Sequence, residues 1–270
     1  MNRFLLTCVC AVAVSLVATG TMADTLFSYD FDSQGLTVGS SLGGQDGWVN
    51  PFAGTNTPKV VNAVGNGGNT TNAAGTNSSA SGTSYYVQKS ISVAFTSADT
   101  NVAFDAWICP CTTTAKESVS TFWEFGSLSN SFAMGWAQIG TTNSKSYLRT
   151  ATGENNGSIT SLTAKDWYDC KVVVDFSVTG GKVVSFSLQD MTTGAAPVYD
   201  PALAGINLGL TSTGGVYTAT MVLPRFDHNT SGVSAFDNPS ISTAVPEPGT
   251  LALLCCGLAG LLCYAWRNRK

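Results

Sequence analysis

The sequence predicts an all-β protein, an antiparallel two-sheet jelly-roll sandwich, flanked by an N-terminal signal helix and a C-terminal transmembrane helix. Three observations predict this arrangement. About nine to eleven short segments have strand character and are separated by polar turns rich in Gly, Asn and Ser. No segment between the chain ends shows the apolar period of an amphipathic helix. Each end of the chain carries a short, uncharged apolar segment beside basic residues.

The clearest strand pattern spans residues 167–178, "WYDCKVVVDFSV". Apolar and polar residues alternate along it, which is the period of a half-buried antiparallel strand. The turn signal "TGGK" follows at 179–182, and the chain returns as "VVSFSLQD". The side chains expected to face the core are Tyr168, Cys170, Val172, Val174, Phe176 and Val178 on the first strand, and Val184, Phe186 and Leu188 on the second.

Similar segments fill most of residues 24–244, which we assign to one β-sandwich domain. The first strands are expected at 26–31 and around Trp48. The uncharged stretch at 62–84 is rich in Gly and Asn, so it buries too little apolar surface to fold alone. We expect it to form a long loop within the domain. Regularly spaced strands without helices favour a sandwich or barrel, and this length favours a jelly roll.

The N-terminus has the order of a secretory signal peptide. Arg3 precedes an apolar run of 14 residues at 4–17, and small residues follow up to Ala23. As a helix this run is about 21 Å long, which is short of the roughly 30 Å hydrocarbon core of a bilayer. We therefore expect residues 1–23 to be a signal peptide that is removed after Ala23, and not a permanent anchor.

The C-terminus resembles a short membrane anchor. Residues 251–266 carry no charge, and as a helix they would extend about 24 Å. A buried core helix would be amphipathic, whereas this segment is apolar all round. Basic residues favour the cytoplasmic side of a membrane. We expect a transmembrane helix at 251–266, held by the basic residues Arg267, Arg269 and Lys270.

Residues 245–270 carry a resemblance to a known signal. The triplet Pro246-Glu247-Pro248, the Leu-rich span and the final Arg-Asn-Arg-Lys resemble the PEP-CTERM sorting signal of exported bacterial proteins. The resemblance implies that Pro246, Glu247 and Pro248 are recognition residues for an exosortase, a membrane protease-transpeptidase that removes the anchor. It implies export, transient membrane anchoring, and delivery to the cell surface or extracellular matrix of bacteria that make exopolysaccharide.

The body carries a second resemblance. "WYDCKVVVDF" followed by "GGKVVSFSL" resembles the central strand pair of concanavalin A-like and laminin-G-like domains. The start, "SYDFDS" with "GQDGW", and the end, "AFDNPSIS", resemble the first and last strands of such jelly rolls. The resemblance implies that these two strands pair with each other. It specifies a fold and no ligand.

The charge of the body excludes nucleic acid as a partner. Without the four basic residues of the two signals and without Glu247, residues 24–244 carry 9 basic and 16 acidic residues, a net charge of −7. Nucleic-acid binding requires a basic patch, which this composition lacks. An acidic body of low charge density suits an exported protein.

Three cysteines lie in the body: Cys109, Cys111 and Cys170. A disulfide from Cys109 or Cys111 to Cys170 would close a loop of about 60 residues and stabilise the fold by about 4 kcal/mol in the chain-entropy account. Cys109–Cys170 is our expected pair. The alternative is that all three are unpaired and pack as small apolar residues. His228 is the body's only histidine and lies far from these cysteines in the sequence, so we expect no zinc site.

Carbohydrate binding is the leading functional hypothesis, because sugar rings stack on aromatic faces beside polar groups. Trp48 lies in a Gly-rich turn between Asp46 and Asn50. Trp107 lies opposite the apolar set of its own strand, so its ring is expected on the outer face. Trp48 and Trp107 are therefore the candidate platforms, with core packing as the alternative for each.

No cofactor is expected, with structural calcium as the exception. Asp30, Asp32, Asp237 and Asn238 lie in the first and last strands, which should pair. Oxygen ligands from neighbouring strands can hold Ca²⁺. The alternative is that these side chains cap turns, as Asp and Asn commonly do.

The sequence gives no enzyme signature. Glycosidases of this fold carry a Glu-x-Asp-x-x-Glu pattern, and retaining hydrolysis needs two carboxyl groups about 5–5.5 Å apart. No such pattern occurs, and Glu124 stands alone between aromatic residues. We therefore predict an exported, non-catalytic protein that binds exopolysaccharide. A carbohydrate-active hydrolase or lyase, and a structural matrix component without a specific ligand, are the alternatives.

Overall fold

The fold was analysed in a computed structural model of the chain. Residues 25–243 form one compact unit. The predicted signal peptide and the sorting signal lie outside the described residues, except for Ala23. Within the part of the chain that the structure describes, no helix is long and apolar enough to cross a membrane. The described residues are 23–52, 56–62, 64–66, 72–76, 83–111, 118–137, 145–228 and 233–243.

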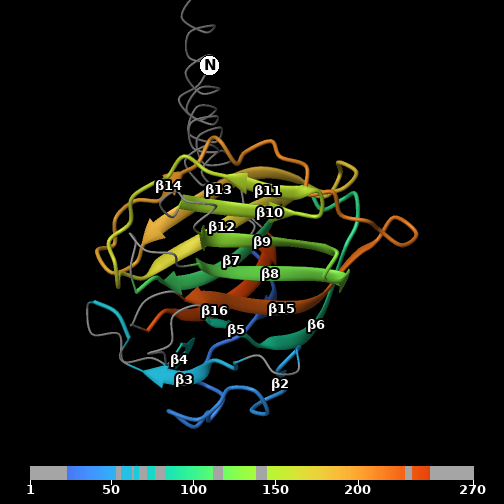
Figure 1. The fold of residues 1–270 in the computed structure, drawn as a ribbon. Helices are drawn as coiled ribbons and strands as arrows, with labels where there is room; N and C mark the ends of the chain where they lie inside the picture. Colours follow the sequence, from blue (N-terminus) through green and yellow to red (C-terminus); the bar gives the residue numbers. More distant parts are fainter. Residues whose placement is uncertain are drawn as a thin grey trace, which may run out of the picture. The chain divides into compact units, whose positions relative to one another are not determined.

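The described residues form two antiparallel sheets and no helix, as the sequence predicts (Figure 1). Sheet A has the order β14 (Val198–Tyr199), β13 (Lys182–Asp190), β12 (Tyr168–Asp175), β7 (Val102–Cys109), β16 (Ala235–Thr243), β4 (Asn72–Gly75) and β3 (Lys59–Asn62), with β1 (Thr25–Ser28) also beside β16. Sheet B has the order β11 (Gly153–Asn156), β10 (Lys145–Thr150), β9 (Asn130–Ala137), β8 (Ser118–Ser127), β15 (Tyr217–His228), β6 (Gln88–Phe95) and β2 (Trp48–Val49), with β5 (Thr83–Tyr86) also beside β15.

The core lies between the two sheets and is built largely from aromatic side chains. Phe104 of β7 stands near its centre and is fully buried. Its ring contacts those of Phe95 and Trp123 edge to face, at centroid distances of 5.7 and 5.3 Å. The Phe132 ring lies 5.0 Å away at 89°. Edge-to-face pairs of this kind add stability beyond the apolar area that they bury.

The predicted central hairpin is present as β12 and β13, with one difference. Every second residue of β12 is buried, which confirms the alternation predicted for this strand. A register shift between Val173 and Val174 places Val183 in the core and turns Val184 outward, where it is 47% exposed. Val184 was predicted to face the core. The β-bulge is the reason for the error, because one extra residue reverses the faces beyond it.

The first and last strands of the body pair with each other, as the resemblance to jelly rolls implies. Thr25 lies opposite Ser242, and Ser28 lies opposite Ser240. β16 also pairs with β7 on its other side. The two ends of the body therefore lie side by side in sheet A.

The low-complexity stretch 62–84 is not wholly a loop. Its residues 72–75 form β4, which pairs with β3 and with β16. The side chains of Ala73 and Ala74 are small enough to be fully covered there. Composition alone did not predict this strand, because its partners, and not its own apolar surface, hold it in place.

Gly75→Ala is expected to destabilise this corner of sheet A by about 1–3 kcal/mol, the usual range for overpacking. A methyl group at Gly75 would overlap Cγ2 of Val61 and lie 3.1 Å from its Cγ1. Val61 is β-branched and has little freedom to move aside. Urea unfolding of the single variant and of Gly75→Ala/Val61→Ala tests this. The double variant should regain part of the loss, and equal stability of wild type and Gly75→Ala would contradict the packing.

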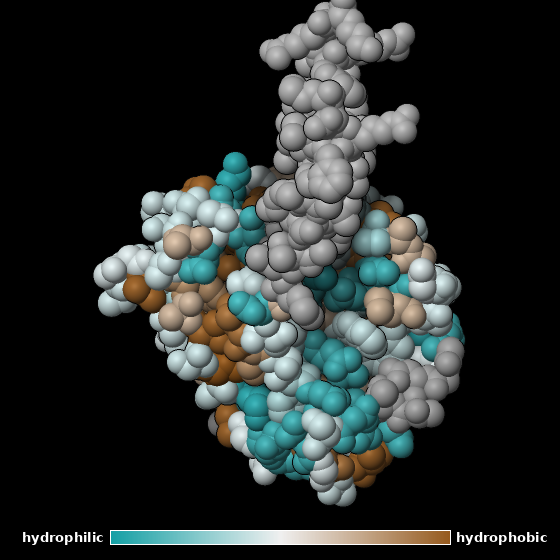
Figure 2. Space-filling model, turned by 180° about the vertical axis from the view of Figure 1, so that it is seen from behind, coloured by the Kyte–Doolittle hydropathy of each residue, from teal (hydrophilic) through white to brown (hydrophobic). Residues whose placement is uncertain are grey.

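The face shown in Figure 2, on the side opposite to Figure 1, is mainly hydrophilic where it is coloured and carries a few apolar patches. Edge strand β14 contributes two of the most exposed large apolar side chains, Val198 at 56% and Tyr199 at 52%. β14 is only two residues long, and β13 is the one strand that pairs with it among the described residues. Short edge strands of this kind limit pairing with other chains.

Candidate functional site

The outer face of sheet A positions Trp107. Alternate residues of β7 point into the core, which leaves Asp105 and Trp107 on the opposite face. In the register of β7 with β12, Trp107 lies opposite Asp169 and Asp105 lies opposite Lys171. The outward orientation predicted for Trp107 is therefore confirmed, and its side chain is half-buried.

A shallow pocket of about 350 Å³ opens beside Trp107. Strands β7 and β12 supply Asp105, Asp169 and Lys171. The start of the chain supplies Asp30, and the bulged part of β16 supplies Asn238. A half-buried aromatic ring beside carboxylate, amide and ammonium groups is the combination that the sequence hypothesis required of a carbohydrate site.

Lys171 lies within ion-pair distance of two carboxylates. Its Nζ is 3.0 Å from Oδ1 of Asp105 and 3.7 Å from Oδ2 of Asp169. Burial raises the pKa of Asp105 to about 6, although Lys171 lowers it. Burial likewise raises the pKa of Asp169, again against the effect of Lys171. Both carboxylates are therefore only partly compensated by the protein.

The Asp169 carboxylate has an unused oxygen. Its Oδ1 is buried, and this atom has no hydrogen-bond partner among the described residues. Buried polar atoms usually have a partner, since burial without one costs about 1–3 kcal/mol. The protein therefore leaves part of the Asp169 charge uncompensated at the wall of the pocket, and a ligand that brings positive charge to this wall would be stabilised.

Asp105→Asn is expected to stabilise the protein at neutral pH and to have little effect below pH about 4. Asp105 has a raised pKa in the folded state, about 6 against 3.8, so its burial costs stability increasingly as pH rises through this interval. The asparagine has no charge to bury, and the gain above pH about 6 should be about 3 kcal/mol. Urea unfolding of both proteins across this pH range tests it. A gain that is the same at all pH values would contradict the assignment.

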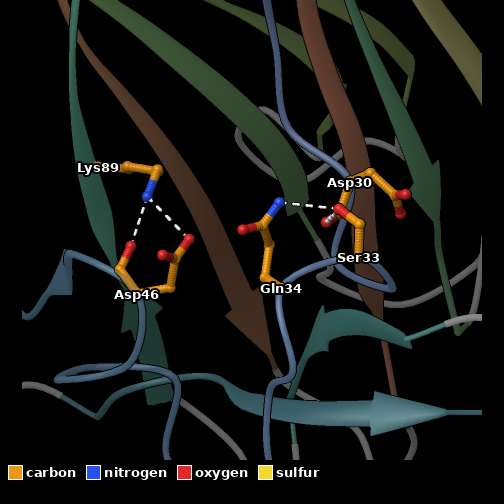
Figure 3. A network of polar contacts seen from close by, with 5 residues as sticks. All are labelled: Asp30, Ser33, Gln34, Asp46 and Lys89. Carbon is orange, nitrogen blue, oxygen red and sulfur yellow. Dashed lines mark hydrogen bonds and ion pairs between the residues drawn. The ribbon is translucent and has the colours of Figure 1, made fainter.

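Trp48 is not a platform, which corrects the sequence prediction. It is fully buried, and its ring stacks on that of Phe31 at 5.6 Å. Lys89 covers this region: its Nζ lies 4.6 Å from the Tyr29 ring and donates a hydrogen bond to Oδ2 of Asp46 at 3.1 Å (Figure 3). The Gly-rich turn folds back over the ring, so neither face of Trp48 is open to a sugar.

The predicted calcium ligands do not assemble into a cluster. Among the described residues, no group of three or more His, Cys, Asp and Glu side chains is placed to hold a metal ion. Asp30 accepts a hydrogen bond from the backbone N–H of Asp32 at 2.9 Å, and Asp32 accepts one from Asn72 at 2.6 Å. Asp237 accepts one from the backbone of Asn238 at 2.8 Å. Asp30 therefore caps a turn, as the alternative proposed, whereas Asp32 binds the first residue of β4 and Asp237 binds its own neighbour in the irregular part of β16.

The expected Cys109–Cys170 disulfide is not formed. Cys109 lies on the outer face of sheet A, in a small cluster with Trp167. Cys170 lies on the inner face, in the main core, as a free thiol. Because the sheet separates the two side chains, no bond can join them without moving the backbone.

A second pocket, of about 90 Å³, lies on the outer face of sheet B and was not predicted from the sequence. Its lining includes Tyr147 and Arg225 together with the smaller residues Ser118, Ser120 and Ala137. Two internal contacts involve its polar groups: Tyr147 donates a hydrogen bond to Glu154 at 3.3 Å, and an Nη atom of Arg225 pairs with Asp227 at 2.8 Å. No sequence pattern could reveal this pocket, because its lining residues come from five strands and meet only through the register of the sheet.

Glu124 remains an isolated carboxylate. It lies on β8, is 7% exposed, and its pKa is raised by burial. Its strand neighbours across β9 and β15 are Ser131 and Met221, neither of which is acidic. The paired carboxylates of a retaining glycosidase are therefore not found around Glu124 in the described part of the sheet.

Comparison with known families identifies the C-terminal segment. Residues 244–270 match the PEP-CTERM protein-sorting motif, which agrees with the signal predicted at 245–270. A chain with this motif is exported and is sorted at the membrane by an exosortase. No curated protein matches the sequence.

Solved structures resemble the body in fold. The globular domain of calreticulin from T. cruzi has a TM-score of 0.52 and 10% identity, covering 92% of this chain and all of that domain. A β-1,3-glucanase from Mycobacterium marinum has a TM-score of 0.44 and 15% identity, covering 81% and 98% of the two chains. At these identities the likeness concerns the fold alone. The body is an antiparallel two-sheet β-sandwich, and its fold resembles that of the calreticulin globular domain.

Proposed function

We propose that the exported body is a non-catalytic polysaccharide-binding domain and that the pocket beside Trp107 is its binding site. The observation that carries this proposal is the single pocket that brings Trp107 together with Asp105, Asp169 and Lys171. The half-buried indole offers a stacking surface, and the charged groups offer hydrogen bonds to sugar hydroxyls. The pocket is shallow and open, which suits a segment of a long polymer better than an enclosed small molecule.

Binding is favoured over hydrolysis by the position of Lys171. Its ammonium lies within 4 Å of both carboxylates, so the two share one ionic partner and neither is a free nucleophile. Retaining hydrolysis instead needs a free nucleophile and a proton donor on the two sides of the scissile bond. The expected result is that the protein holds polysaccharide without releasing reducing ends.

The destination follows from the sorting motif. We propose that an exosortase removes the anchor at Pro246–Pro248 and leaves the body at the cell surface or in the extracellular matrix. Exopolysaccharide is the ligand that we propose for the body there. Mass spectrometry of the mature C-terminus tests the processing step. A surface protein that still carries Arg267–Lys270 would contradict it.

The binding proposal is tested with the full chain purified in detergent and a panel of soluble bacterial polysaccharides. Retarded migration in polysaccharide-containing gels measures binding, and a reducing-end assay on the same mixtures measures hydrolysis. Retardation without new reducing ends supports the proposal. No retardation with any polysaccharide, with or without calcium, would overturn it and favour the structural alternative. New reducing ends would favour the hydrolase.

A further inference from the structure

We infer that the pocket beside Trp107 selects glycans with free, positively charged amino groups, such as polymers that contain glucosamine. This inference rests on the proposed function, since it names the class of polysaccharide that the same pocket binds. Three features of the pocket carry it: an excess of carboxylates, an unused carboxylate oxygen and an accessible indole ring.

The first feature is the charge of the lining. Three carboxylates, from Asp30, Asp105 and Asp169, face the pocket together with one ammonium, from Lys171. Asp105 and Asp169 share that ammonium, and Asp30 adds negative charge at the rim. The pocket therefore attracts a cationic sugar and repels a uronic acid, and the interaction is strengthened by partial burial.

The second feature is the free acceptor. Oδ1 of Asp169 is buried and has no hydrogen-bond partner in the part of the chain that the structure describes, although the other carboxylate oxygen lies 3.7 Å from Nζ of Lys171. An ammonium group offers three donors and a charge that compensates a buried carboxylate. A hydroxyl or an acetamide N–H satisfies the oxygen but leaves the charge of the pocket unchanged. The amino sugar is therefore the better partner.

The third feature is the ring itself. Trp107 lies directly opposite Asp169 across the β7–β12 pair, so a ligand group bound to one lies beside the other. Indole is the aromatic ring that attracts cations most strongly, through the negative potential of its face. An acetylated sugar stacks on the same ring without this electrostatic attraction. Ring and carboxylate thus select the same cationic group.

The test compares three oligosaccharides of equal length: one of glucosamine, one of N-acetylglucosamine and one of a uronic acid. Their dissociation constants for the full chain in detergent are measured at a pH where the amine is protonated. The glucosamine oligomer should bind at least about tenfold more tightly than the acetylated one, which corresponds to about 1.4 kcal/mol. The uronic acid oligomer should bind most weakly.

Two variants localise the preference. Asp169→Asn keeps the shape and removes the charge, so the preference for glucosamine should fall to about twofold or less, while the acetylated oligomer keeps its affinity. Asp30→Asn changes a carboxylate at the exposed rim and should reduce the preference by a smaller factor. This variant provides the test if Asp169→Asn does not fold. Asp175→Asn is the matched control, because Asp175 lies on the same face of β12 outside the pocket.

The outcomes separate the two proposals. Equal affinity for the glucosamine and acetylated oligomers, with both lost in Trp107→Ala, would overturn the inference and leave polysaccharide binding intact. A preference for glucosamine that persists in both Asp169→Asn and Asp30→Asn would also overturn it, because the charge would then lie elsewhere. If the protein binds none of the three oligomers, this inference is wrong. The proposed function is then tested separately by the polysaccharide panel.

Discussion

Trp107→Ala is expected to weaken polysaccharide binding by at least about 30-fold, which corresponds to about 2 kcal/mol. The indole supplies the main stacking surface of the pocket, and no other Trp or Phe lines it among the described residues. Aromatic side chains at the centre of a binding site commonly contribute this much. The dissociation constant of the best ligand in the polysaccharide panel, measured for wild type and variant, provides the test.

Two further variants show whether the effect is specific. Tyr199→Ala removes an exposed aromatic ring from the same sheet but from outside the pocket, and should leave binding unchanged. Trp107→Phe keeps an aromatic face and should retain part of the affinity. If Trp107→Ala binds as tightly as wild type, the stacking role assigned to this residue is wrong.

Phe104→Ala is expected to lower the free energy of unfolding by about 3–5 kcal/mol. The ring is fully buried and packs against aromatic rings of the opposite sheet, so truncation leaves a cavity that cannot easily collapse. A loss of this size is a large part of the stability of a typical domain. Urea unfolding followed by tryptophan fluorescence measures it.

Val184→Ala is the comparison for this core variant. Val184 lies in the same sheet but is turned outward by the β-bulge, and its loss should cost less than about 0.5 kcal/mol. Similar losses for Phe104→Ala and Val184→Ala would contradict the core and the bulge described for β13.

The sandwich was predictable because an antiparallel strand with one face in the core and the other in solvent alternates apolar and polar residues along the sequence. The clearest case is β12, where each second residue is buried as predicted. The bulge that exposes Val184 and the short strand β4 were not predictable. Both depend on the partner strand, through a register shift in one case and through the fit of Gly75 against Val61 in the other.

The candidate site was predictable in part for the same reason. Alternation along β7 placed Trp107 on the outer face, and the structure agrees. The carboxylates beside it come from β7 and from its neighbour β12, and no pattern along one strand reveals which residues a register brings together. For Trp48 the sequence prediction was wrong. Its position in a Gly-rich turn suggested an exposed ring, but the ring packs on Phe31.

The disulfide prediction was wrong because the number of residues between two cysteines does not show on which face of a sheet each side chain lies. Cys109 and Cys170 lie on neighbouring strands, β7 and β12, which would bring their backbones close. Their side chains nevertheless point to opposite faces. The alternative reading, cysteine as a small apolar residue, describes Cys170 in the core.

The central claim is that polysaccharide binds at the outer face of sheet A, beside Trp107. Oxidative footprinting of the full chain, with and without saturating polysaccharide, tests it most directly. Trp107 and Tyr86 are both half-buried, and Tyr86 lies beside Arg225 at the pocket of sheet B. The account predicts that bound polysaccharide protects Trp107 from oxidation and leaves Tyr86 unchanged. Protection of Tyr86 with no change at Trp107 would contradict it and place the ligand on sheet B.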